Sequence, residues 1–185
     1  MNAVVQRCRR VALSVAAGLV LGLAGGAPAQ DRPTDYQVKA AFLEKFGKFI
    51  EWPNNAFATP GSPLVIGVFG ENPFHGALEN LAARDTINGH PVEVRELKAL
   101  PDLKGCHIVF VASTAKAEQR DVLDAIRRSP ILTVGDTDDF CDNGGMVQFI
   151  VQNDQVHFQI RNEAARAAGL KISSKLLILA KRAGQ

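Results

Sequence analysis

Hydrophobic residues follow two different spacings along the chain. Between Asp35 and Ile50 they recur at three- and four-residue steps, which is typical of one buried face of a helix. Continuous apolar runs at 64–69, 107–112 and 131–134 instead indicate strands buried on both faces, as in parallel sheets covered by helices. Helical spacings at 73–83 and 115–128 separate these runs. The pattern therefore predicts a parallel βα core.

The pattern changes in the last third of the chain. Apolar positions at 146–151 and 156–160 flank Gln152 to Gln155, which predicts an antiparallel hairpin with a type I-like loop. The Asn88-Gly89 turn signal precedes an alternating stretch at 91–97 that predicts a half-exposed edge strand. Helices are predicted at 163–168 and from Ser173 or Ser174 onward. The predicted fold class is α/β, a single domain whose mixed sheet has a parallel βα core extended by a C-terminal antiparallel hairpin, with helices on both faces.

Residues 1–29 differ from the rest of the chain. They contain three arginines, then an uncharged apolar run at 11–24, then small residues up to Ala29. This order is typical of a secretory signal peptide cleaved after Ala29. A transmembrane anchor is the alternative, but the run is shorter than the ~20 residues that span a bilayer. We therefore predict export to the periplasm, with residues 30–185 forming the mature domain.

Composition excludes one class of function. The chain has 185 residues, of which 46% are hydrophobic and 22% charged, as in ordinary folded proteins. Removal of residues 1–29 changes the formal net charge from +2 to −1, because that segment holds three arginines and no acidic residue. Nucleic-acid binding rests on a dense cationic surface. A near-neutral mature chain therefore predicts no nucleic-acid partner.

Metal and cofactor sites are not predicted. After loss of the signal peptide only Cys106 and Cys141 remain, and with His107 they lack the close paired spacing of zinc ligands. Acidic residues that cluster after the third apolar run do not match a calcium-binding loop; they are Asp136, Asp138, Asp139 and Asp142. The sequence at this point does not decide whether Cys106 and Cys141 form a disulfide, although a domain of this size does not need one.

Catalytic motifs are not recognised either. The loop at 69–73 lacks the phosphate-binding glycine patterns, and Glu71 would repel an anion. Cys106 and His107 are adjacent in a predicted strand, so their side chains point to opposite faces and cannot form a nucleophile and base pair. We expect no enzymatic activity, with a hydrolase using Ser113 or Asp136 as the weakest alternative.

Five blocks in the same order span about residues 35–180 and carry a family resemblance. They are 36–43 with 46–53, 66–70 with Pro73-Phe74, 106–110, 132–136 with Phe140 and 144–146, and 158–162 with 169–177. Each block alone is unspecific. Together they resemble the YfiR/HmsC-like periplasmic family.

The resemblance implies a small exported α/β protein that acts by binding other proteins. It implies inhibition of an inner-membrane diguanylate cyclase through the periplasmic sensor region of that enzyme, with lower cyclic di-GMP and less biofilm as the output. Capture of the inhibitor by an OmpA-like outer-membrane lipoprotein would relieve the inhibition. A homodimer would match the two-fold symmetry of a dimeric cyclase.

The chain departs from this resemblance at two positions. Some similar proteins carry cysteines that pair with the equivalents of Cys106 and Cys141. Gly67 and Gln148 occupy the places of those partner cysteines here. We therefore predict that Cys106 and Cys141 are free thiols.

Two segments are candidates for partner binding. The C-terminal segment combines polar and basic groups with Leu170; its candidates are Arg161, Asn162, Arg166, Leu170 and Lys171. Trp52, the only tryptophan, is the second candidate anchor. Two alternatives to partner binding stay in view. Trp52 can pack in the core, and Arg161 can form an ion pair with Glu163.

A periplasmic small-molecule-binding module that serves another membrane sensor is the alternative function. Its pocket is expected at the carboxyl ends of the parallel strands, near Gly70, Ser113 and Asp136.

Overall fold

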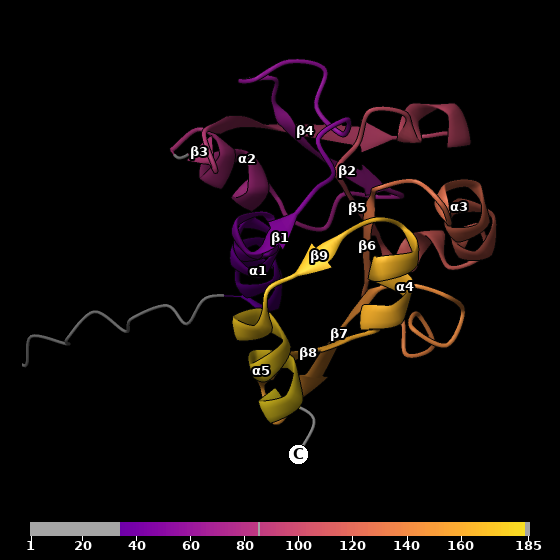
Figure 1. The fold of residues 1–185 in the computed structure, drawn as a ribbon. Helices are drawn as coiled ribbons and strands as arrows, with labels where there is room; N and C mark the ends of the chain where they lie inside the picture. The colour runs from indigo at the N-terminus through magenta and orange to yellow at the C-terminus, as the bar shows by residue number, and fades with distance from the viewer. Residues whose placement is uncertain (1–33, 85, 184–185) are drawn as a thin grey trace, which may run out of the picture. The chain divides into compact units, whose positions relative to one another are not determined.

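The computed structural model describes residues 34–84 and 86–183, so the predicted signal peptide lies outside the described residues. The fold lies within a compact unit that spans residues 33–185 (Figure 1). Its main sheet has seven strands in the order β3-β4-β2-β5-β6-β7-β8. Their bounds are β2 (Leu64–Phe69), β3 (Thr86–Ile87), β4 (His90–Leu97), β5 (Ile108–Val111), β6 (Leu132–Gly135), β7 (Val147–Gln152) and β8 (Gln155–Ile160).

Strands β4, β2, β5, β6 and β7 pair in parallel. Strands β3 and β8 are antiparallel to their neighbours and form the two edges. The helices are α1 (Asp35–Phe49), α2 (Ala77–Ala82), α3 (Gln119–Ile126), α4 (Asn162–Ala167) and α5 (Ser174–Ala183), with 3-10 turns η1 (Leu100–Leu103) and η2 (Ser113–Ala115). The predicted α/β class with a C-terminal hairpin is confirmed.

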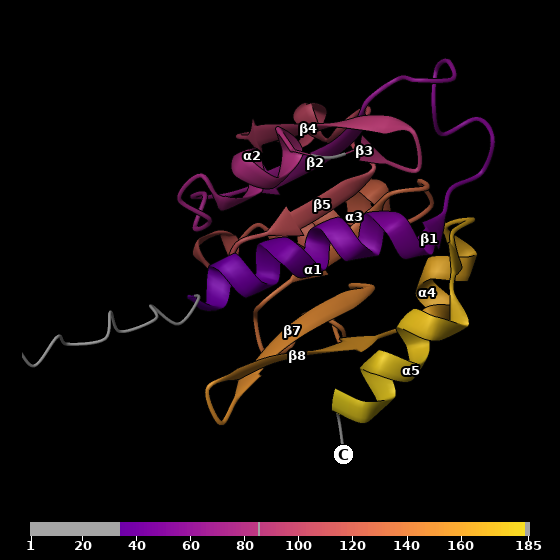
Figure 2. The ribbon, with the colours of Figure 1, turned by 90° about the vertical axis from the view of Figure 1, so that its left-hand side faces the viewer.

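Buried side chains form one layer on each face of the sheet. The larger layer joins α1 and α2 to inward residues of the strands, for example Phe46 and Leu78 with Phe110. The second layer joins α3 and η1 to the opposite face through residues such as Val122 and Leu103. Figure 2 shows α1 running along β5 in the opposite direction, so the helix connects the two ends of the sheet. Continuous burial of β2 and β5 follows from these two layers.

Local sequence fixes the start of α1. The Thr34 side chain accepts a hydrogen bond from the Gln37 amide, and the Gln37 side chain accepts one from the Thr34 amide, which is a capping box. The helix ends at Phe49, before the predicted boundary at Pro53. The next two residues, β1 (Ile50–Glu51), pair antiparallel with β9 (Lys171–Ile172) in a separate small sheet. Strands of two residues have no hydrophobic period, so the sequence pattern did not predict this pair.

Two predicted helices are shorter than expected. α2 begins at Ala77 because His75 and Gly76 have positive φ angles of 48° and 83°, which interrupt the helix. Asn72 accepts from the Phe74 amide instead of capping a helix at Pro73. α3 begins at Gln119 because the chain first forms the 3-10 turn η2. The helical spacing of hydrophobic residues continues through both turns, so the sequence pattern predicted helices that are too long.

The hairpin loop also differs from the prediction. Asn153 and Asp154 have φ angles of 52° and 57°, so two left-handed residues form the tight turn between β7 and β8. This is a type I′ geometry, which matches the twist of the strands better than a type I-like loop. β4 was predicted to be an edge strand. It is the second strand of the sheet, because β3 pairs with its outer side. Within the described residues, no helix has the length and apolar character needed to cross a membrane.

Candidate functional site

The β1–β9 pair brings the two predicted binding segments together. Glu51 is opposite Lys171 in this ladder, and Trp52 directly follows Glu51. The Phe49 carbonyl accepts a hydrogen bond from the Ser173 amide, which extends the connection by one residue. Figure 1 shows β1 and β9 side by side, and Figure 2 shows β1 and α4 at the same side of the molecule. We call the surface formed by Glu51, Trp52, Arg166 and Lys171 the β1–β9 surface.

Charged side chains on the β1–β9 surface are free to meet a partner. Arg166 is exposed on α4. The side chains of Lys171 and Glu51 are 82% and 79% exposed, and their closest oxygen and nitrogen atoms are 3.9 Å apart. An ion pair so exposed and so long contributes little to stability. Breaking this ion pair so that Lys171 and Glu51 can contact another protein therefore costs little free energy.

Trp52 is half-buried beside this surface. Its ring packs edge-on against Phe57 and His107, with centroid distances of 6.4 Å and 6.2 Å. The indole N–H is buried and has no hydrogen-bond acceptor among the described residues. Trp52 thus combines an aromatic face at the core with an unused polar group.

The other three candidates in the C-terminal segment differ in exposure, since Leu170 is buried, Asn162 is half-buried and Arg161 is exposed. Leu170 is 1% exposed and belongs to the main core, so the prediction that it forms the apolar centre of a surface site is wrong. Arg161 donates from its guanidinium to the Cys141 carbonyl, and this contact takes the place of the suggested ion pair with Glu163. Asn162 is half-buried at the start of α4.

An aromatic stack fixes the loop that follows Trp52. Phe57 lies between the imidazoles of His90 and His107, with centroid distances of 3.8 Å and 4.3 Å and interplanar angles of 12° and 16°. His107 Nδ1 accepts from the Val65 amide at 3.1 Å, so its Nε2 carries the proton and donates to the Ala56 carbonyl at 3.1 Å. Burial lowers the pKa of His107, and the positive charge of Arg95 acts in the same direction. The stack therefore holds a neutral His107.

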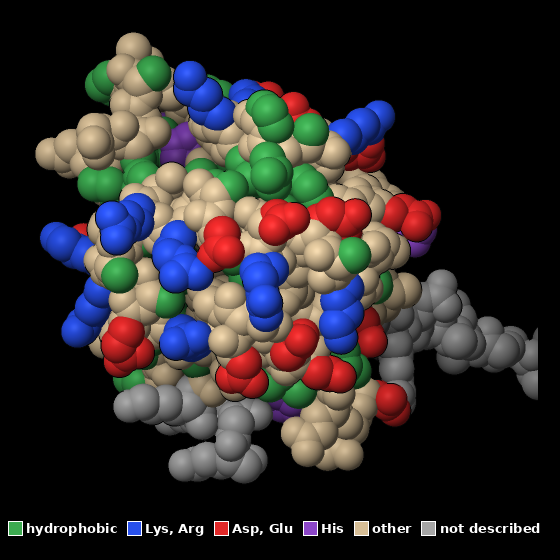
Figure 3. Space-filling model, turned by 90° about the vertical axis from the view of Figure 1, so that its right-hand side faces the viewer, with side chains coloured by type: hydrophobic (Ala, Val, Ile, Leu, Met, Phe, Trp, Pro, Cys, Tyr) green, Lys and Arg blue, Asp and Glu red, His purple; other side chains and the backbone are tan. Residues whose placement is uncertain are grey.

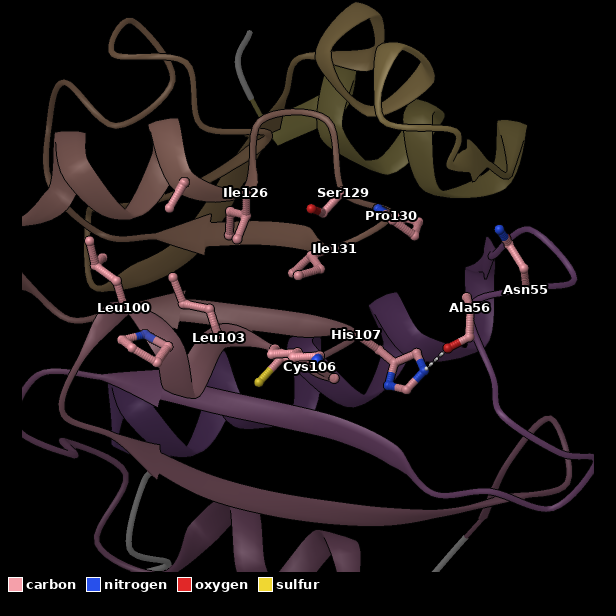
Figure 4. Close-up of a pocket in the computed structure, with 14 residues that line it drawn as sticks. Asn55, Ala56, Leu100, Leu103, Cys106, His107, Ile126, Ser129, Pro130 and Ile131 are labelled. Atoms are coloured by element: carbon pink, nitrogen blue, oxygen red, sulfur yellow. Dashed lines mark hydrogen bonds between the residues drawn. The ribbon is translucent and has the colours of Figure 1, made fainter.

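A cavity of about 490 Å³ lies at the amino ends of β5 and β6 (Figure 4). Its inner wall consists of Leu103, Cys106, Ile126 and Ile131, each 6% exposed or less. Leu100, 41% exposed, lies at its rim with Asn55, Lys104 and Ser129. Figure 3 views the molecule from the side of α3 and shows a group of hydrophobic side chains next to a surface on which acidic and basic side chains are interspersed. Ala56 and His107 also line the cavity, so it adjoins the loop after Trp52.

The expected pocket at the carboxyl ends of the strands has a different form. Asp136 follows β6 and is engaged by α1, because Lys39 Nζ lies 2.8 Å and the Tyr36 hydroxyl 2.9 Å from its Oδ2. The side chains of Lys39 and Asp136 are 6% and 5% exposed. Gly70 does border a cavity of about 320 Å³, but Ser113 and Asp136 do not line it. This cavity therefore does not bring Gly70, Ser113 and Asp136 together.

Tyr36 and Lys39 were missed by the sequence prediction. Burial and the charge of Asp136 raise the pKa of Tyr36 to about 12. Lys39 also lies 4.2 Å from the centre of the Tyr36 ring. One signal was present in the sequence, because Lys39 shares the apolar helix face with Leu43 and Phe46 at spacings of four and seven. A lysine on such a face needs a buried partner.

Cys106 and Cys141 are free and buried. A Cβ atom built on Gly67 would lie 3.0 Å from the Cys106 sulfur, so the two positions are neighbours across the sheet. Gln148 accepts from the Cys141 amide at 3.0 Å and donates to the Asp138 carbonyl at 2.8 Å. Burial raises the pKa of the Cys141 thiol to about 11. Hydrogen bonds from Gln148 thus hold the Cys141 loop.

Among the described residues, no group of three His, Cys, Asp or Glu side chains is arranged to hold a metal ion. The acidic cluster considered for calcium is divided, since Asp136 faces α1 whereas Asp138 is exposed.

Comparison with known proteins agrees with this architecture. A family model described as YfiR/HmsC-like matches residues 36–181. No curated protein matches the chain. The matched range begins at the tyrosine that bonds Asp136 and contains every strand of both sheets. The chain therefore belongs to the YfiR/HmsC-like family, a periplasmic and regulatory family connected with diguanylate cyclase signalling.

Proposed function

We propose that this protein is a periplasmic inhibitor of an inner-membrane diguanylate cyclase. It binds the periplasmic sensor region of that enzyme and favours its inactive state, which lowers cyclic di-GMP and biofilm formation. The observation that carries the proposal is the family match over residues 36–181. An exported regulator can shift a membrane sensor only by binding one of its states more tightly than the other.

The β1–β9 surface supports a role in protein binding. Its exposed charges belong to Glu51 and Lys171, which are opposite each other in the ladder, and to Arg166 on α4, and the half-buried Trp52 directly follows Glu51. Protein interfaces commonly combine an aromatic anchor with a polar, charged rim. The buried indole N–H of Trp52 lacks an acceptor among the described residues and gains a hydrogen bond if a partner supplies one.

The proposal includes two further contacts. Capture by an OmpA-like outer-membrane lipoprotein relieves the inhibition, because one inhibitor molecule cannot occupy two partners through the same surface. A homodimer of the inhibitor presents two copies of the β1–β9 surface and matches the symmetry of a dimeric cyclase. Signal-peptide cleavage after Ala29 delivers the mature domain to the compartment in which all three proteins meet.

Site-specific crosslinking in cells tests this function. A photo-reactive residue replaces Lys171 in the full-length protein, and irradiated membranes are analysed for covalent adducts. Lys171 is exposed and on the proposed surface, so we expect an adduct with a membrane protein that contains a diguanylate cyclase domain. The matched control carries the same residue at exposed Lys98, which follows β4 at another part of the sheet, and should form no such adduct.

Charge reversal provides an independent check of the surface. Arg166→Glu combined with Lys171→Glu should reduce recovery of the cyclase and raise cyclic di-GMP, whereas Lys98→Glu should change neither. All three positions are exposed, so the variants should fold. Equal cyclase adducts at residues 98 and 171, or none at either, would show that this surface does not bind a cyclase.

A further inference from the structure

We propose that the cavity at the amino ends of β5 and β6 binds a small amphiphilic carboxylate, with an aromatic ring or short hydrocarbon chain on its inner wall. The volume of about 490 Å³ lies in the range of sites for small organic ligands. This inference goes beyond the proposed function, because it concerns the isolated protein and requires no partner.

The inner wall defines the apolar part of the ligand. Leu103 comes from η1, Ile126 from α3, and Ile131 from the residue before β6. Figure 4 shows these side chains around one space, with the Cys106 sulfur beside them. All belong to the buried layer between α3 and the sheet. A ring or chain that covers them removes apolar surface from water, which favours binding.

The rim defines the polar part. Among the described residues, Lys104 is the one charged side chain that lines the cavity, since His107 is held neutral by the Val65 amide and the Ala56 carbonyl. Within the described ranges Lys104 has no ion-pair partner. Ser129 and Asn55 add hydrogen-bonding groups at the same rim. An anionic group on the ligand therefore meets a free cation and no carboxylate.

The cavity adjoins the single tryptophan through the aromatic stack. Ala56 and His107 line the cavity, and the His107 ring packs edge-on against Trp52. A ligand that contacts these residues changes the surroundings of Trp52, so tryptophan fluorescence reports its binding. The same connection links the cavity to the β1–β9 surface.

Binding of two matched probes to the purified mature protein tests the inference. The probes are 4-phenylbutyrate and its neutral amide, titrated up to about 10 mM with calorimetry and Trp52 fluorescence as readouts. We expect both to bind, and the carboxylate to bind about two- to fivefold more tightly, which is the effect of a solvent-exposed ion pair. No binding of either probe would overturn the proposal.

Three variants locate the site. Ala125→Phe fills the cavity from an exposed helix position and should weaken both probes at least about tenfold, whereas Ala167→Phe, exposed on α4, should not. Lys104→Gln should remove the advantage of the carboxylate and leave the amide unchanged, whereas Lys175→Gln should preserve that advantage. Full affinity in Ala125→Phe would place the ligand elsewhere. A carboxylate advantage that survives Lys104→Gln would contradict recognition of an anion at this rim.

Discussion

The two ends of the parallel strands differ in the contacts that their residues make. At the carboxyl end the first two turns of α1 supply Tyr36 and Lys39, whose polar groups engage the buried Asp136. At the amino end the loop after Trp52 is tied by aromatic stacking and neutral His107, and an apolar cavity opens beside it. The difference shows that α1 engages Asp136 at the carboxyl end, where a cavity of about 320 Å³ remains beside Gly70, whereas the amino end has a cavity of about 490 Å³ with an apolar wall. Ligands of α/β folds usually bind at carboxyl ends, but here α1 engages Asp136 at that end.

The largest expected effect is at the carboxyl end. Lys39→Met should lower the free energy of unfolding by about 3 to 5 kcal/mol, because it leaves the buried Asp136 charge without its cation. Urea denaturation measures the change. Lys45→Met, at an exposed position of the same helix, should cost far less. Equal losses for the two variants would show that the Lys39–Asp136 pair does not close this end.

A covalent link can reinforce the amino end. Gly67→Cys should form a disulfide with Cys106, because a Cβ at residue 67 would lie 3.0 Å from the Cys106 sulfur. In the chain-entropy model the bond adds about 3 to 4 kcal/mol, reduced by displacement of Leu97, whose Cδ1 would lie 2.5 Å from the new Cβ. The comparison is between oxidised and reduced forms of the same variant in urea, with Gly67→Ser as the control for displacement. Failure to oxidise would contradict the inferred proximity.

The amino end should also be sensitive to acid. Because the folded pKa of His107 is lowered, the unfolded chain binds more protons as pH falls below about 6.5, and stability decreases through that range. Urea midpoints at about pH 7.5 and pH 5 measure this loss. His107→Gln keeps an acceptor and a donor but does not titrate, so part of the acid sensitivity should disappear. His75→Gln, at an exposed position, should retain it. Identical pH profiles for both variants would exclude His107 as the source.

The carboxyl end should respond to alkali instead. A raised folded pKa of about 12 means that the contribution of Tyr36 to stability is complete below pH 10 and is lost as pH rises toward 12. The chain has one tyrosine, so ultraviolet absorbance follows its ionisation directly. The native protein should titrate near 12, and the urea-unfolded chain near 10. Titration of the native protein near 10 would contradict burial of Tyr36 against Asp136.

The fold could be predicted where hydrophobic periodicity was long and uninterrupted. The runs that became β2, β5 and β6 and the spacing of α1 were sufficient for the α/β class. The β1–β9 pair could not be predicted, because residues 50 and 172 are far apart and each strand has only two residues. The same ladder places Glu51, the residue before Trp52, opposite Lys171, and so connects two segments that the sequence identified separately. Leu170 was assigned to the surface because a single apolar residue beside a helix break has no period to reveal its burial.

The candidate site depended on contacts between distant residues. The stack of His107, Phe57 and His90 requires the loop path that only the structure provides. The cavity similarly needs η1 and α3 to approach each other across the strand ends. Lys39 was the exception, because a charge among apolar helix positions could have indicated a buried partner.

Cellular cyclic di-GMP in a strain that lacks this protein tests the central claim most directly. The strain is complemented with the full-length protein or with a version that lacks residues 1–29. We expect deletion to raise cyclic di-GMP and surface attachment, and only the full-length protein to restore both. Unchanged cyclic di-GMP on deletion, or restoration by the version without residues 1–29, would contradict a periplasmic inhibitor of a diguanylate cyclase.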